Sequence, residues 1–243
     1  MPGAGGSASR RRPAAASRAE LGAQLAEALE QLGLALGAPA QGLLLDYLEL
    51  VVRWNRSFNL TAIRDPAAMV AAHLADSLSL VPLLDALPPG ALLVDVGSGA
   101  GLPGIPIGIA RPDLRIDLVE PVGKKAAFLR QCRAELGLAN IQVHEARVEQ
   151  LSLDAEPAVI TSRAFASLAD FAAGVAGIVG PGTRILAMKG ARPDAEIEEL
   201  GARALPWRAS RIETLEVPGL DAQRCVVVLE PQPIFPAPNP AEP

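Results

Sequence analysis

The fold is decided by Leu93-Val94-Asp95-Val96-Gly97-Ser98-Gly99-Ala100-Gly101-Leu102-Pro103-Gly104-Ile105-Pro106. The stretch opens with the apolar residues of a buried strand and ends in several glycines, which let a backbone pass close to a ligand. A helix is expected to start near Pro106, because proline is favoured in a first helical turn. Strand, glycine loop and helix in this order are typical of an α/β fold that binds its ligand at the end of a strand.

Two phosphate-binding motifs fit this loop poorly. A nucleotide P-loop has the spacing of Gly99 and Gly104, but it requires Lys and then Ser or Thr, where this chain has Ile105-Pro106. A dinucleotide fingerprint, GxGxxG, is matched by Gly99, Gly101 and Gly104. That match is a weak signal by itself, and it leaves the residues before Gly99 without a role.

A third ligand explains those residues. Proteins that bind S-adenosylmethionine (SAM) carry acid-x-Gly-x-Gly-x-Gly at this place, and Asp95, Gly97, Gly99 and Gly101 match it in full. SAM carries a sulfonium, an ammonium and no phosphate, so a nearby carboxylate is favourable, whereas a pyrophosphate would be repelled by it. The loop therefore predicts SAM as the cofactor.

The next two strands add candidate contacts for an adenosine. Glu120 ends the second predicted strand, 25 residues after Asp95, where a carboxylate can accept both ribose hydroxyls. NAD sites share this acid, so Glu120 supports an adenosine without choosing between ligands. Residues 146–149 follow the third strand, and their backbone or side chains could bond the adenine edge.

Short apolar runs alternate with helical stretches from residue 91 onward. The predicted strands, with helices between the first six, are 92–96, 115–120, 141–145, 158–162, 184–189, 211–217 and 224–230. This alternation predicts parallel pairing with helices on both faces. The last two strands are joined through Pro218-Gly219 without room for a helix, so one of them must run antiparallel. The predicted class is α/β: a doubly wound, mostly parallel seven-stranded sheet of the SAM-dependent methyltransferase type, with an N-terminal helical extension.

The rest of the chain is divided by composition. A helix with an apolar stripe is expected to run to about Trp54, and Asp65-Pro66 begins another over 67–84. The N-terminal tail carries four arginines and no acid, and the C-terminal tail holds six prolines. The predicted units are a disordered basic tail, a helical lobe, a SAM-binding domain and a disordered proline-rich tail, at residues 1–18, 19–88, 89–230 and 231–243.

Composition excludes several classes of protein. The net charge of −5 and an aromatic content of 3% argue against non-specific nucleic-acid binding and against a base-stacking platform. Two cysteines cannot form a disulfide framework, which favours the cytoplasm. The chain has no run of 18 apolar residues, so no membrane span is predicted. It also has no CxxC or HExxH motif, so no metal site is predicted. A monomer is favoured.

The residues that are missing at the strand ends restrict the possible methyl acceptors. Amino-group methyltransferases place an (Asn/Asp)-Pro-Pro-aromatic motif where this chain has Thr161–Phe165, and neither cysteine ends a strand to serve as a nucleophile. No strand end offers a His or a Lys–acid pair for deprotonating a hydroxyl, although Lys189 is left unexplained. An acceptor atom that already has a free lone pair, such as guanine N7, needs no base and only has to be aligned with the methyl group.

Three residues are the predicted catalytic group. Arg163 ends the fourth strand, where its guanidinium could hold guanine O6 or a phosphate, or form a structural salt bridge. The same two readings apply to Arg147. Asn59 could reach the target base or stabilise a loop. In addition, His73 and Asp76, one helical turn apart, could brace the helical lobe or contact RNA.

Several specific segments occur together in one known family. They are Trp54-Asn55, Asn59-Leu60-Thr61, His73-x-x-Asp76-Ser77, 95–106, Lys124 with Phe128-Leu129, Arg147-Val148-Glu149, 162–168 and Lys189-Gly190. Over about residues 40–230 the chain thereby resembles the bacterial 16S ribosomal RNA guanine-N7 methyltransferase family, formerly called glucose-inhibited division protein B. One mild departure is Glu120, where many members carry Asp; both can bond ribose hydroxyls.

The resemblance implies direct, in-line methyl transfer from SAM to a guanine N7 of 16S ribosomal RNA. The acceptor would be the free RNA or a small ribosomal subunit particle. The implied SAM contacts are Gly97, Leu102, Val148, Glu149 and Arg163. Two alternatives stay open: a SAM-dependent methyltransferase that acts on a small molecule, and a non-catalytic RNA-binding relative.

Overall fold

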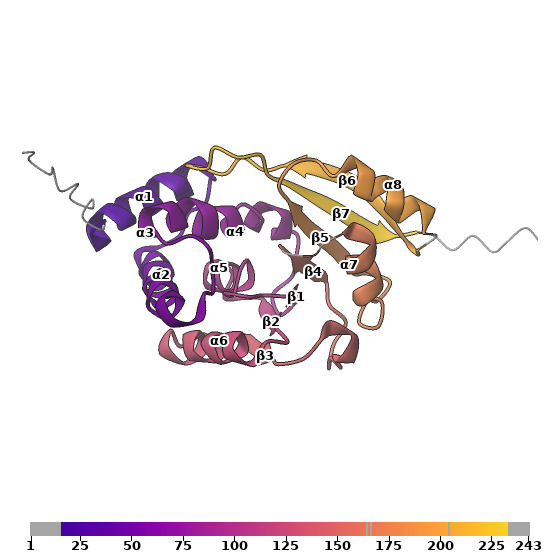
Figure 1. The fold of residues 1–243 in the computed structure, drawn as a ribbon, viewed down its shortest axis with the longest axis horizontal. Helices are drawn as coiled ribbons and strands as arrows, with labels where there is room; N and C mark the ends of the chain where they lie inside the picture. Colours follow the sequence, from indigo (N-terminus) through magenta and orange to yellow (C-terminus); the bar gives the residue numbers. More distant parts are fainter. Residues whose placement is uncertain (1–15, 164, 166, 204, 233–243) are drawn as a thin grey trace, which may run out of the picture.

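The computed structural model describes residues 16–163, 165, 167–203 and 205–232, and within them it shows one seven-stranded sheet between two layers of helices (Figure 1). The strands are β1 (Leu92–Val96), β2 (Arg115–Val119), β3 (Ile141–His144), β4 (Val159–Ser162), β5 (Arg184–Lys189), β6 (Trp207–Thr214) and β7 (Cys225–Pro231). Their order is β3-β2-β1-β4-β5-β7-β6. The first five strands are parallel, and β7 runs antiparallel to both β5 and β6. The predicted fold class is confirmed.

The helices are α1 (Arg18–Gln31), α2 (Ala38–Phe58), α3 (Pro66–Met69), the π-helix η1 (Val70–Ala75), α4 (Asp76–Leu78), the 3-10 helix η2 (Val81–Leu84), α5 (Gly104–Ala110), α6 (Gly123–Glu135), the 3-10 helix η3 (Val148–Gln150), α7 (Leu168–Gly174) and α8 (Asp194–Ala202). The helix predicted over 67–84 is thus interrupted by a π segment. Its start is as predicted, because the side chain of Asp65 accepts a hydrogen bond from the N–H of Ala67 and Pro66 takes the first position.

Alternate residues of each strand face opposite helical layers. Leu93 of β1 packs in a hydrophobic cluster with the N-terminal helices, α5 and α6, whereas Leu92 and Val94 pack in a second cluster with α7 and α8. These two groups of helices lie at the left and right of Figure 1. The N-terminal helices therefore share a core with the sheet. They also contact the loop after β1 directly, since the buried Tyr47 hydroxyl donates to the carbonyl of Ala100 at 2.6 Å.

Two predicted elements differ from the structure. The connection between β3 and β4 is only the single turn η3 and a loop, where a helix was expected. Since β3 lies at the edge and β4 beside β1, this connection must cross two strands, and extended chain does so with fewer residues than a helix. Strand β6 begins at Trp207, earlier than the predicted residue 211, because a bulge between Ala209 and Arg211 lets it continue.

One helical stretch is unusually apolar. Among the described residues, 66–84 is the one helix long and apolar enough to cross a membrane, with a mean hydropathy of 1.6. However, 72% of it is buried inside the molecule, so packing in the core accounts for its composition. Of the two predicted tails, residues 1–15 and 233–243 lie outside the described residues.

Candidate functional site

The loop after β1 owes its shape to three glycines. Gly97, Gly99 and Gly101 have φ angles of 70°, 58° and 89°, a region that side chains rarely allow. A Cβ atom at Gly97 would meet no heavy atom within 4 Å, so this part of the loop faces open space. A Cβ at Gly101 would instead collide with Ile105. The loop thus presents backbone to a ligand on one side and packs against α5 on the other.

Asp95 lies beneath this loop. Its side chain is fully buried, and its Oδ2 accepts a hydrogen bond from the N–H of Gly104 at 3.0 Å, which ties β1 to the start of α5. Its Oδ1 has no hydrogen-bond partner among the described residues. Burial raises the pKa of this carboxyl from 3.8 to about 7, and the bond from Gly104 opposes the rise. In this structure Asp95 therefore shapes the loop from within.

Glu120 joins the glycine loop to the end of β2. It is buried, and its two carboxylate oxygens accept hydrogen bonds from the N–H groups of Gly99 and Val122, each at 2.9 Å. Each oxygen of a carboxylate has a second lone pair, with which it can accept a bond from a ribose hydroxyl. An open glycine edge beside a buried carboxylate, with no basic group on the loop itself, fits the adenosine of a cationic cofactor such as SAM.

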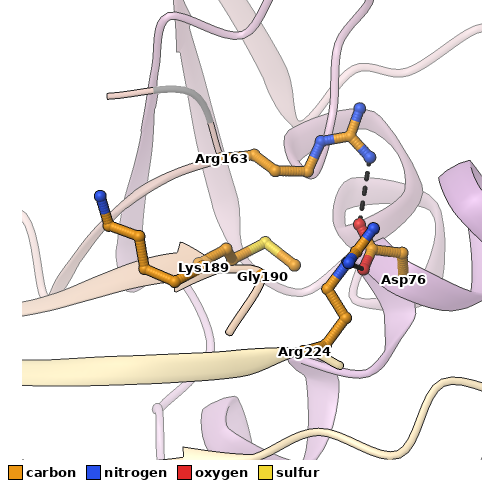
Figure 2. Close-up of a pocket in the computed structure, with 6 residues that line it drawn as sticks. Asp76, Arg163, Lys189, Gly190 and Arg224 are labelled. Atoms are coloured by element: carbon orange, nitrogen blue, oxygen red, sulfur yellow. Dashed lines mark hydrogen bonds and ion pairs between the residues drawn. The ribbon is translucent and has the colours of Figure 1, made fainter. Parts of the chain in front are cut away.

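A cavity of about 310 Å³ lies at the ends of the neighbouring strands (Figure 2). Its lining residues come from the helix over 66–84, from the end of β5, and from the segments just after β4 and β5 and just before β7. They are Asp76, Arg163, Met188, Lys189, Gly190 and Arg224. Because β1 and β4 are adjacent and parallel, the glycine loop and Arg163 follow neighbouring strands at the same edge of the sheet. The order of the sheet reverses between β1 and β4, which is where α/β folds bind ligands.

Two arginines of the cavity share one carboxylate. Nη1 of Arg163 lies 3.1 Å from Oδ2 of Asp76, and Nε of Arg224 lies 2.9 Å from Oδ1. Asp76 is 1% exposed, whereas the side chains of Arg163 and Arg224 are 29% and 26% exposed and reach the cavity. Two guanidinium groups against one carboxylate leave a positive charge, which suits an electron-rich base or a phosphate.

Lys189 corrects one prediction. The ends of the strands were expected to lack a Lys–acid pair, but Nζ of Lys189 lies 2.7 Å from Oε2 of Glu196 on α8. The pairing arises because only a short loop separates Lys189, at the end of β5, from the start of α8, which carries Glu196. The amine also donates to the carbonyl of Phe165 at 3.3 Å and points away from the two arginines (Figure 2). The Lys189 nitrogen is thus engaged by two protein acceptors, Glu196 and the carbonyl of Phe165.

The chain matches a model of a known family over residues 40–227, described as GidB, rRNA small subunit methyltransferase G. This chain belongs to that family. A relative from Ralstonia nicotianae, named "Ribosomal RNA small subunit methyltransferase G", is 50% identical over 84% of this chain and 94% of its own length. A relative of the same name from Burkholderia mallei is 49% identical over 91% of this chain and 96% of its own length. The family predicted from the sequence is confirmed.

Solved structures resemble the chain more distantly. One is a SAM-dependent methyltransferase from Thiobacillus denitrificans in complex with S-adenosyl-L-homocysteine. It is 12% identical, with a TM-score of 0.48, over 66% of this chain and 92% of that one. Across the described part of the chain, no group of three or more His, Cys, Asp and Glu side chains is arranged to hold a metal ion.

Two other residues of the predicted catalytic group lie outside the cavity lining. Asn59 ends α2 with φ 49°, is exposed, and accepts a hydrogen bond from Nη2 of Arg64 at 2.6 Å, as a loop-stabilising amide would. Arg147 and Glu149 are exposed at η3, next to the buried Val148. The cavity thus brings together Arg163, Asp76 and Lys189 but not Arg147 or Asn59.

Two aromatic or basic side chains near the site have packing partners. Phe165, for which base stacking was one reading, stacks on Phe171 of α7 with ring centroids 4.8 Å apart. His73 is 2% exposed, and its Nε2 lies 3.0 Å from Oγ1 of Thr61, so the imidazole joins the helix over 66–84 to the loop after α2. Burial lowers the pKa of His73 and so favours the neutral form of the imidazole.

Arg224 is the site residue that sequence reasoning missed. It precedes β7, and β7 pairs antiparallel with β5 so that Cys225 lies opposite Lys189. The start of an antiparallel strand therefore lies at the same edge as the ends of the parallel strands. The sequence predicted that one of the last two strands runs antiparallel but not which of them lies beside β5, so it did not make Arg224 a candidate.

Proposed function

We propose that this chain transfers a methyl group from SAM to N7 of a guanine in 16S ribosomal RNA. Membership of the GidB family and the names of relatives that are about 50% identical support the RNA substrate. The observation that carries the finer proposal is the cavity in which Arg163 and Arg224 meet beside the glycine loop. With ribosomal RNA as its substrate, the protein is expected in the cytoplasm.

The glycine loop and Glu120 would hold the cofactor. SAM, when bound, supplies an electrophilic methyl group on its sulfonium. The open backbone at Gly97 would lie against the cofactor, and the carboxylate of Glu120 would accept the ribose hydroxyls. Asp95 would act indirectly by fixing the loop between β1 and α5. The resemblance adds Leu102, Val148 and Glu149 as contacts.

Guanine N7 suits the groups that the cavity offers. Its lone pair needs no deprotonation, and the cavity's lysine is committed to Glu196. The guanidinium donors match O6, the acceptor next to N7, or a neighbouring phosphate. The protein's work is then to hold the base in line with the methyl group and to exclude water, which contributes a large share of the rate in reactions between two bound molecules.

The proposal is tested with the purified protein, SAM, and small-subunit particles or 16S RNA from cells that lack the activity. Nucleosides from the digested RNA are read by mass spectrometry, and we expect new 7-methylguanosine. Arg163→Gln should lower the transfer rate at least tenfold, because a charged hydrogen bond is lost. Arg115→Gln is the matched control. Arg115 begins β2, at the opposite end of the strands from the cavity, and it pairs with Asp154, so its loss should leave the rate unchanged.

Each other outcome points to a different conclusion. A different methylated nucleoside would keep the cofactor and overturn the argument for a lone pair that needs no base. Methyl transfer without RNA would favour the small-molecule enzyme. RNA binding without SAM binding would favour the non-catalytic relative. Full activity of Arg163→Gln would remove Arg163 from the proposed site.

A further inference from the structure

The carboxylate of Asp76 lies where three distant segments of the chain meet. Asp76 begins α4 and is 1% exposed, and its two oxygens accept hydrogen bonds from different arginines (Figure 2). Oδ2 holds Arg163, which follows β4, and Oδ1 holds Arg224, which precedes β7. One buried group thereby sets the relative placement of two guanidinium groups that arise from different strands.

The backbone around Asp76 is also arranged to hold Arg163. In an α-helix the N–H of Asp76 would bond to the carbonyl of Ala72. Here it bonds to the carbonyls on either side of Ala72, because residues 70–75 form a π-helix. The carbonyl of Ala72, without its usual α-helical donor, accepts a bond from Nη1 of Arg163 at 3.0 Å. Such π turns occur frequently at functional sites.

We propose that Asp76 is the positioning residue of this cavity, orienting Arg163 and Arg224 toward the RNA. The inference rests on the proposed function. Asp76 itself is shielded from substrate, since it is buried and both its oxygens are engaged. Each arginine binds it through a single nitrogen, and a guanidinium has five N–H donors, so donors remain for the substrate.

The charge of Asp76 is as necessary as its shape. Without it, two positive groups would face each other in a partly buried cavity and would separate, because their repulsion is poorly screened there. Asn in place of Asp76 supplies one acceptor and one NH2 group. It can satisfy one arginine but turns a donor toward the other, so it disrupts the pair while leaving the side-chain volume almost unchanged.

The test measures kcat and KM of Asp76→Asn with the small-subunit RNA substrate, well below the melting temperature of each variant. We expect kcat/KM to fall about tenfold to a hundredfold, since charged hydrogen bonds are lost to both arginines. In a double-mutant cycle with Arg224→Gln, the double variant should lose less than the product of the two single losses, because Asp76 acts partly through Arg224. A purely structural role would give multiplicative losses.

Asp113→Asn is the matched control. Asp113 lies 2.8 Å from Nη2 of Arg111, an ion pair just after α5 that takes no part in the cavity lining. We expect this variant to keep the wild-type kcat/KM. Wild-type kcat/KM in Asp76→Asn, or multiplicative losses in the cycle, would overturn the positioning role.

If Asp76→Asn does not fold, the contact between Asp76 and Arg224 can be tested on the wild-type protein. The Nε–H of Arg224 donates to a buried oxygen, so its NMR resonance should be sharp and should exchange with water far more slowly than that of an exposed arginine. Rapid exchange would show that Asp76 does not hold Arg224, and it would overturn the positioning role. If the wild type methylates no RNA, the proposed function fails, while this resonance still tests Asp76 independently.

Discussion

Replacing Asp95 by Asn should remove a defined part of the pH dependence of stability. Asp95 is fully buried, and burial raises its pKa from 3.8 to about 7 in the folded protein. Because the folded-state pKa is the higher one, this group favours the fold at low pH. That contribution is lost as the pH rises through about 7. Asn keeps the shape and can accept the bond from Gly104, but it does not ionise.

The magnitude follows from the two pKa values. A rise from 3.8 to about 7 is equivalent to about 4 kcal/mol, at about 1.4 kcal/mol for each pKa unit. Solubility favours working above the sequence pI of 5.2, so pH 6 to pH 8 is the useful window. Within it the carboxyl changes from mostly protonated to mostly ionised in the folded state, while it stays ionised in the unfolded chain. The difference across the window is about 1.4 kcal/mol.

Urea unfolding of both proteins at pH 6, 7 and 8 measures this difference. From pH 6 to pH 8 the wild type should lose about 1.4 kcal/mol relative to Asp95→Asn, a midpoint shift of about 0.5 M for an m-value of about 3 kcal/mol/M. The comparison cancels groups that both proteins share, including His73, whose lowered pKa acts in the opposite direction. Free energies that change in parallel with pH would refute the buried ionisation.

Three further substitutions test the ligand-binding end of the sheet. Gly104→Ala places a Cβ against the side chain of Leu118 and should cost about 1–3 kcal/mol of unfolding free energy, seen in the melting temperature; Gly177→Ala, with nothing within 4 Å of the new Cβ, is its control. Tyr47→Phe leaves a buried backbone carbonyl without its donor and should cost about 1–3 kcal/mol in urea unfolding; an unchanged midpoint would contradict it. Glu120→Gln should weaken SAM binding at least tenfold by calorimetry, because an amide cannot accept both loop N–H bonds, and wild-type affinity would exclude it from the cofactor site.

Much of the fold could be predicted because apolar patterning reports burial. The five parallel strands and the closing antiparallel pair follow from alternating strand and helix patterns and from a connection too short for a helix. The π segment at 70–75 could not be predicted in this way, since an α turn and a π turn rich in Ala and Leu bury the same side chains. The burial pattern does not determine which carbonyl each N–H bonds to. In this chain that pairing leaves the carbonyl of Ala72 to accept a hydrogen bond from Arg163.

The two halves of the site differ in how visible they are in the sequence. The proposed cofactor half is contiguous, because one strand, one loop and the start of α5 supply most of it, and Glu120 follows the neighbouring strand. The proposed acceptor half is assembled from distant residues: Asp76 and Arg224 are 148 positions apart and meet only in the folded protein.

Either of the last two strands could have been the one beside β5, and only the order β5-β7-β6 brings Arg224 to the cavity. A rule for reading such sequences follows. Residues that end parallel strands are the usual candidates for a substrate site, but an antiparallel strand inserted among them contributes the residues that precede it. In this chain that residue is an arginine, Arg224, and it shares the carboxylate of Asp76 with Arg163, which follows β4. The acceptor site of a sheet with this topology should therefore be sought at the beginning of its antiparallel strand as well as at the ends of its parallel ones.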